Sequence, residues 1–85
     1  MTNEEYSQVQ EQIWNGIPAN IRSDVEGMDP MQREERLSLL ADQFRREVEQ
    51  GEQMEWNLYL ELLAIDIIRR RNLRAQRMAQ GNFVR

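Results

Sequence analysis

Apolar residues recur along most of this chain at intervals of three and four, the period that places them on one face of an α-helix. The segment 3–15 is the first to show this pattern. Its repeating apolar residues are Tyr6, Val9 and Ile13. Thr2 and Glu5 have the spacing of a capping box, and Gly16 follows the last repeat. The pattern therefore predicts a helix between these two signals.

Two more helices are predicted between residues 16 and 51. The connector 16–28 has apolar residues at helical spacing, which predicts one short helix. These residues are Ile17, Ile21, Val25 and Met28. The segment 29–51 has the clearest start, because Asp29 can cap a helix and Gln32 completes a capping box with it. Its apolar stripe consists of Leu37, Leu40, Ala41, Phe44 and Val48. Gly51 ends it.

The segment 52–81 holds the last and longest predicted helix, which runs from about residue 53 to residue 80. Residues 82–85 follow it as a tail. At 1.5 Å per residue it would be about 40 Å long, which is more than a folded chain of 85 residues needs. Its C-terminal half is therefore expected to project from the fold or to pack on something else. A break at Gly51 makes this helix and the preceding one an antiparallel hairpin. With no β-strand pattern along the chain, the sequence predicts one all-α domain, a small helical bundle built on this hairpin.

The long helix carries more apolar surface than one contact face requires. One stripe consists of Trp56, Tyr59, Leu60, Leu63 and Ile67. A second stripe consists of Leu58, Leu62, Ile65 and Leu73. Together they cover more than half of the circumference, whereas a surface helix needs an apolar arc of about 100°. Either this is the central helix of the monomer, or the surplus forms an interface with another chain, anchored by Trp56 and Tyr59.

Asp66 lies between the two stripes, within the run "LLAIDIIRRR". An unpaired carboxylate buried there would be costly or would take up a proton, so Asp66 needs a partner. Arg69 and Arg70 follow it at three and four residues, within side-chain reach on one helix. Two interpretations stay open: a local pair with Arg70 at the edge of the core, or a charged contact across an interface.

Charge is divided unevenly along the chain, although the net charge is only −4. Residues 4–66 hold all 15 acidic residues and five of the 11 arginines, a net charge of −10. Residues 67–85 hold the other six arginines and no acid, a net charge of +6. Such segregation can mark an interaction segment, head-to-tail self-association, or one end of the molecule folding back on the other. The acidic surface could also occupy a basic groove meant for nucleic acid, as a small inhibitor would.

The arginines of the long helix gather on its C-terminal half. Arg70, Arg74 and Arg77 share one face, and Arg69 and Arg71 flank them. Three interpretations compete: a solvated helix end that complements the helix dipole, a contact with an acidic surface of another copy or a partner protein, and nucleic-acid binding. This short segment resembles the arginine-rich peptides that bind RNA hairpins. The acidic remainder of the chain would repel phosphate and restrict such contact to this segment.

The side chains that most enzymes use are missing. The chain has no histidine, cysteine or lysine, so catalysis is not expected. The usual ligands of zinc are absent, no glycine-rich phosphate loop is present, and we expect neither a metal nor a cofactor. The N-terminus lacks the pattern of a signal peptide, and no apolar run approaches the ~20 residues of a membrane span. We therefore expect a soluble, cytoplasmic protein that does not contact membranes.

The sequence thus predicts a non-enzymatic protein-protein interaction module, such as an oligomer subunit, an adaptor or a small inhibitor of a larger complex. Self-association into a homo-oligomer is expected. The predicted partner-binding residues are Trp56, Tyr59, Leu63, Asp66, Ile67, Arg70 and Arg74. The alternative is an RNA-binding or other nucleic-acid-binding protein. Its contact residues would be Arg69, Arg70, Arg71, Arg74 and Arg77.

Overall fold

Four helices and no strand make up the chain from residue 2 to residue 81, the part whose backbone a computed structural model describes. Side chains are described within that range except at residues 3 and 79–81, and the predicted tail at 82–85 lies outside it. The helices are α1 (Asn3–Gly16), α2 (Ala19–Glu26), α3 (Pro30–Glu49) and α4 (Trp56–Gly81). The all-α prediction is confirmed. None of these helices is both long and apolar enough to cross a bilayer.

Local sequence signals set the starts of α1 and α3. The Thr2 hydroxyl accepts a hydrogen bond from the backbone N–H of Glu5 at 3.1 Å, so the predicted capping box at α1 is present. At α3, the Asp29 carboxylate accepts from the backbone N–H of Gln32 at 2.8 Å, which confirms the second box. Each cap satisfies an N–H group that has no partner within the helix.

The start of α4 differs from the prediction. Gly51 has φ +76°, the left-handed conformation that glycine adopts without steric cost, and the chain reverses there. The Glu52 N–H then donates to the Glu47 carbonyl at 2.8 Å, so this residue closes the end of α3 instead of beginning the next helix. Residues 52–55 are used in the reversal, and α4 begins at Trp56 rather than at about residue 53.

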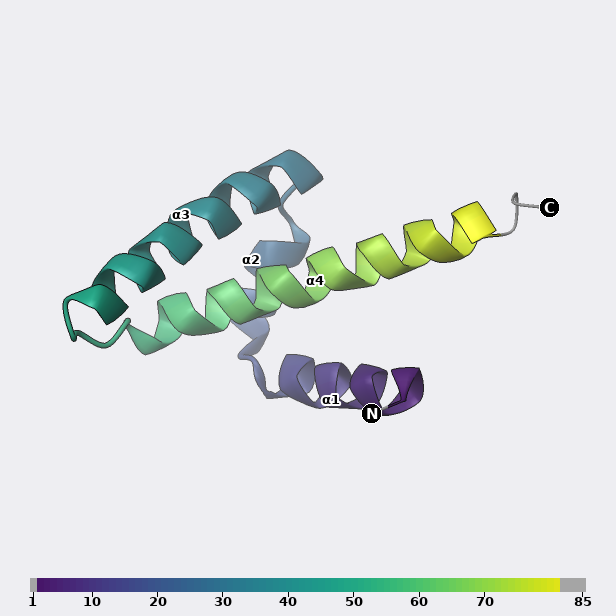
Figure 1. Ribbon diagram of the computed structural model, residues 1–85, viewed down its shortest axis with the longest axis horizontal. Helices are drawn as coiled ribbons and strands as arrows, with labels where there is room; N and C mark the ends of the chain where they lie inside the picture. The colour runs from purple at the N-terminus through teal and green to yellow at the C-terminus, as the bar shows by residue number, and fades with distance from the viewer. Residues whose placement is uncertain (1, 82–85) are drawn as a thin grey trace.

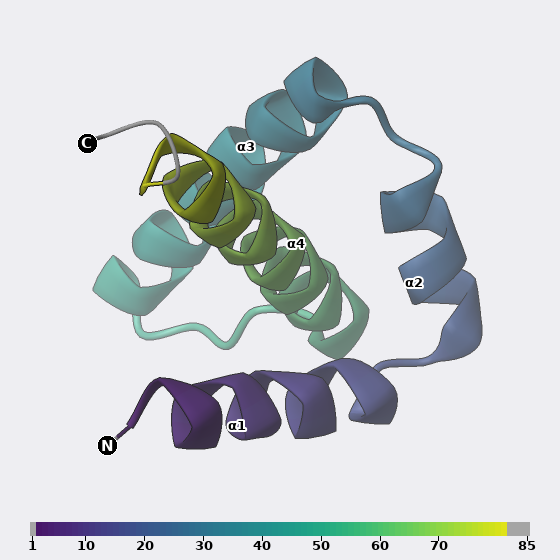
Figure 2. The same cartoon turned by 90° about the vertical axis from the view of Figure 1, so that its right-hand side faces the viewer.

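The central element of the fold is α4, with the other three helices around it. In Figure 1, α3 and α4 form a hairpin that opens toward the C-terminal end of α4, and α1 lies along the opposite side of α4. Viewed nearly along its axis in Figure 2, α4 has α3, α2 and α1 on three sides. Its contacts with α3 and α2 are much more extensive than those with α1. The molecule measures 50 × 26 × 26 Å, with its long dimension along α4.

The core lies between the C-terminal end of α1, α2, α3 and the N-terminal half of α4. Its buried residues are Trp14, Ile17, Ile21, Val25, Leu40, Leu60, Ala64, Ile65 and Ile67. Leu58 and Leu62 are half-buried and pack against this cluster. The second apolar stripe of the long helix is therefore largely covered within the monomer along this half, which corrects the idea that it forms a docking face. The reason is that α2, although short, lies directly on that stripe.

Ion pairs join α3 to α4 beside the core. Arg36 donates from Nε and Nη2 to the two carboxylate oxygens of Glu61, at 2.8 and 3.0 Å. These hydrogen bonds raise the pKa of Arg36 above its usual value; partial burial opposes the shift and the negative charge of Glu61 adds to it. Arg69 pairs with Glu34 at 2.9 Å further along the hairpin. Both pairs join residues that are distant in sequence, and they help to hold the two helices at one spacing.

Candidate binding surfaces

The predicted partner-binding residues of α4 lie at different depths. Ile67 is only 5% exposed and belongs to the core, so it offers no surface to a partner. Tyr59 and Leu63 are half-buried. Trp56 is 66% exposed at the first position of the helix. The first apolar stripe therefore rises from the core toward the surface at the hairpin turn.

Phe44 of α3, which was not predicted as a site residue, lies next to the aromatic pair Trp56 and Tyr59 through its contact with Tyr59. The Trp56 and Tyr59 rings are stacked with centroids 5.7 Å apart, and the Phe44 ring lies 6.4 Å from that of Tyr59. Val48, one helical turn beyond Phe44, is also exposed. These four residues, Phe44, Val48, Trp56 and Tyr59, form what we call the aromatic patch. The apolar stripe of α3, which extends to Val48, was the signal that could have identified its α3 half.

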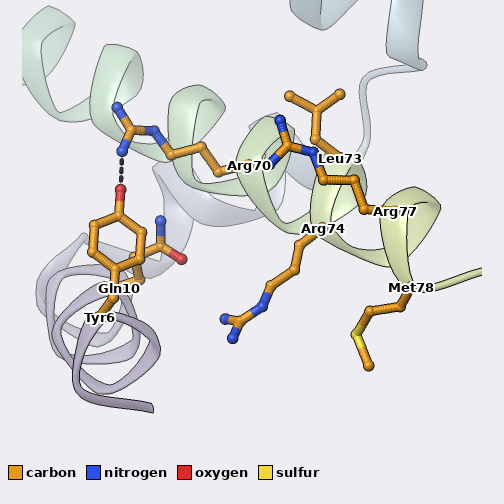
Figure 3. Close-up of a pocket in the computed structure, with 7 residues that line it drawn as sticks. All are labelled: Tyr6, Gln10, Arg70, Leu73, Arg74, Arg77 and Met78. Carbon is orange, nitrogen blue, oxygen red and sulfur yellow. Dashed lines mark hydrogen bonds between the residues drawn. The ribbon is translucent and has the colours of Figure 1, made fainter. Parts of the chain in front are cut away.

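Asp66 is paired on its own helix. Its carboxylate lies 3.0 Å from Nε of Arg70, which is the local i,i+4 pair among the two interpretations drawn from the sequence. Arg70 also donates from Nη1 to the hydroxyl of Tyr6 on α1 (Figure 3). The side chains of Asp66 and Arg70 are both partly exposed. Asp66 therefore needs no second chain to satisfy its charge.

The other arginines of α4 reach in several directions. Arg71 pairs with Glu11 of α1, and its guanidinium lies over the Trp14 ring, 5.3 Å from the centroid. Arg74 donates to the hydroxyl of Ser7, also on α1. Together with the Arg69 pair to α3, these contacts attach the neighbouring helices to the C-terminal half of α4. Three of the predicted nucleic-acid contacts, Arg69, Arg70 and Arg71, thus have carboxylate partners within the chain.

A groove of about 560 Å³ runs between α1 and the C-terminal half of α4. We call it the α1–α4 groove. Its lining residues are Tyr6, Gln10, Arg70, Leu73, Arg74, Arg77 and Met78. Figure 3 shows Arg74 and Met78 extending from α4 on the side that faces α1. Four of these residues, Tyr6, Gln10, Leu73 and Met78, were not predicted as site residues. Tyr6 and Gln10 could not be predicted because only the fold brings α1 beside this part of α4, whereas Leu73 belongs to the second apolar stripe of the sequence.

Comparisons with protein-family models, with curated proteins and with solved structures found no match for this chain. Among the described residues, no cluster of three or more acidic side chains is placed to hold a metal ion. The candidate binding sites of this chain are therefore the aromatic patch and the α1–α4 groove.

Proposed function

We propose that this protein is a non-enzymatic protein-binding module that self-associates through the aromatic patch. The observation that carries the proposal is the exposure of Trp56, which is 66% accessible although it stacks on Tyr59. Phe44 and Val48 extend this exposed apolar surface onto a second helix. Contiguous apolar surface of this kind is characteristic of interaction sites.

Burial of these side chains by a partner would be favourable. An aromatic side chain can remove 150–250 Å² from water, at about 25 cal/mol per Å². The ring contacts among Trp56, Tyr59 and Phe44 also limit the orientations open to each ring, so less conformational entropy is lost on binding. Tryptophan and tyrosine are enriched among the residues that dominate binding energies.

A second copy is the partner that the size of the chain favours. A chain of 85 residues buries only about 60–65% of its unfolded surface, and association is a common way for such small domains to gain apolar burial. The most frequent arrangement is a two-fold dimer, in which the same patch meets itself. In that arrangement, Trp56 and Val48 of each copy would be covered by the other.

Light scattering at increasing protein concentration tests this proposal. The wild-type mass should rise to that of a dimer, and Trp56→Ser should return it to the monomer. Met31→Ser is the matched control, because Met31 is also exposed on α3 but lies outside the patch; this variant should behave like wild type. A wild-type mass that stays monomeric up to millimolar concentration would refute self-association.

Nucleic-acid binding through Arg69, Arg70, Arg71, Arg74 and Arg77 stays the alternative function. It is less well supported, because the first three have carboxylate partners in the chain and would have to exchange them for phosphate. RNA binding that weakens steeply with salt and is lost in an Arg74→Ala, Arg77→Ala double variant would favour this alternative.

A further inference from the structure

The α1–α4 groove differs in charge from other hollows on the molecule. Three other hollows each include at least one carboxylate: Glu34 in one, Asp24 and Glu61 in another, and Asp42 and Glu49 in the third. The described residues that line the α1–α4 groove include three arginines and no acidic residue. In a chain with net charge −4, this groove is a local concentration of positive charge.

Two of the three arginines in the groove lack a carboxylate partner among the described residues. Arg70 is paired with Asp66, but the contact of Arg74 is with the uncharged hydroxyl of Ser7. No ion pair or side-chain hydrogen bond holds Arg77 within the described part of the chain, and it lines the groove near its C-terminal end. The positive charge of Arg74 and Arg77 is thus available to an anionic ligand.

The walls of the groove also present apolar groups. Leu73 lies between the arginines on α4, and Met78 is 69% exposed at the end of the groove. Tyr6 presents its ring from α1, with its hydroxyl bonded to Arg70 (Figure 3). A ligand that fills this groove must therefore combine apolar surface with negative charge. Methionine adapts its shape to the side chains that pack on it.

The spacing of the arginines suits a helical ligand. Arg70, Arg74 and Arg77 stand at i, i+4 and i+7, so they extend over about 10 Å of α4. Carboxylates at the same spacing on a ligand helix could meet them, while apolar residues on the adjacent stripe contact Leu73, Met78 and Tyr6. Binding of an amphipathic helix in a groove between two helices is a common mode of peptide recognition.

We infer that the α1–α4 groove binds an acidic amphipathic helix of a partner protein. The groove is separate from the aromatic patch, so this inference does not depend on self-association. A polyanionic nucleic acid fits the groove less well, because its phosphates would also face the acidic remainder of the chain. Among the described lining residues, Tyr6 alone would offer its bases an aromatic platform.

A synthetic helical peptide of about 18 residues, roughly 27 Å long as a helix, is the probe for this site. It carries leucines in one stripe and glutamates at i, i+4 and i+7 beside that stripe, with a fluorescent label for anisotropy measurements. One control peptide has glutamine in place of each glutamate, and a second has serine in place of each leucine. The full-length protein should bind the first peptide and neither control.

Protein variants then locate the binding site. Arg77→Glu should weaken binding about tenfold or more, because it replaces an attractive charge pair with a repulsive one. Arg46→Glu is the matched control: it makes the same change of charge on α3, outside the groove, and should change affinity less than about twofold. Trp56→Ser should bind the peptide like wild type, so loss of self-association and loss of peptide binding can be distinguished.

Four outcomes would overturn the inference. The first two are failure of the acidic peptide to bind and equal binding of the glutamine peptide. The third is displacement of the bound peptide by a single-stranded RNA at lower concentration than unlabelled peptide, which would assign the groove to nucleic acid. The fourth is a monomeric mass for Arg77→Glu under conditions in which the wild type is a dimer, which would assign the groove to a second copy. Circular dichroism and thermal unfolding would establish that Arg77→Glu and Arg46→Glu are folded.

Discussion

The two halves of α4 belong to one continuous helix but are held in place by different forces. Its core half, residues 58–68, is enclosed by α2 and α3, and Leu60, Ala64 and Ile65 are buried there. Its arginine half, residues 69–78, contacts α1 mainly through polar groups. These contacts are Arg70 with Tyr6, Arg71 with Glu11 and Trp14, and Arg74 with Ser7.

The difference shows where the fold is fixed and where it can open. Burial of apolar surface in the core half contributes most of the stability and is not screened by salt. The polar contacts of the arginine half are partly exposed, and exposed ion pairs usually contribute only about 0–1 kcal/mol each. Trp14 and Ile17 fix the C-terminal end of α1 in the core, whereas the part of α1 before Trp14 can move relative to α4 at low cost, as a groove that admits a ligand requires. Four predictions test this contrast, from the largest expected effect to the smallest.

Truncation of a core residue should have the largest effect. Leu40→Ala removes a side chain that is 1% exposed, and we expect the free energy of unfolding to fall by about 2–5 kcal/mol. The neighbouring Leu39 is 62% exposed on the same helix, so Leu39→Ala should change the free energy of unfolding by less than about 0.5 kcal/mol. Urea denaturation measures both. Similar losses in the two variants would show that α3 does not pack as described.

Substitution of the hairpin glycine should have the next largest effect. Gly51→Ala places an alanine at a backbone position with the left-handed conformation, which should lower the free energy of unfolding by about 1–2 kcal/mol. No atom lies within 4 Å of the added methyl group. The cost is therefore backbone strain alone. At Gly16, the last residue of α1, φ is not positive and the space is also open, so Gly16→Ala should be neutral within about 0.5 kcal/mol. Thermal unfolding measures both variants, and equal melting temperatures for Gly51→Ala and Gly16→Ala would contradict this prediction.

Removal of the two matched helix caps should affect different parts of the molecule. Asp29→Ala and Thr2→Ala each delete a capping-box side chain, typically worth about 1 kcal/mol. Because α3 packs on the core half, Asp29→Ala should lower global stability. Thr2→Ala should increase hydrogen exchange in α1 and leave global stability nearly unchanged. A global loss in both variants would mean that α1 unfolds together with the core.

Salt should produce the smallest and most localised change. Between about 0.1 and 1 M NaCl the screening length falls from about 10 to 3 Å, which weakens the contacts of Arg71 with Glu11. Amide exchange in α1 should accelerate severalfold, while exchange in the core half of α4 stays constant or slows. Arg71→Gln should reproduce the effect of high salt on α1 at low salt. Equal acceleration in α1 and in the core half would remove the distinction between the two halves.

Much of the secondary structure could be predicted because its signals are local. The capping boxes at Thr2 and Asp29 each depend on residues three positions apart, and the Asp66–Arg70 pair lies within one helical turn. The predictions were less accurate at the start of α4, where the end of α3 used Glu52 to close its last turn. No pattern within a few residues of Trp56 shows that the preceding segment is needed for a reversal.

The sequence by itself determined the helical character of the chain, the caps, and the separation of acidic from basic residues, because each depends on residues close together along the backbone. Only the tertiary structure decided which side chains of α4 are core and which are surface. It buried Ile67, placed Phe44 beside Tyr59 while leaving Trp56 exposed, and placed Tyr6 against Arg70, which is 64 positions away. Such contacts depend on how the helices pack in three dimensions, and the period of a single helix carries no information about the direction from which its neighbours approach.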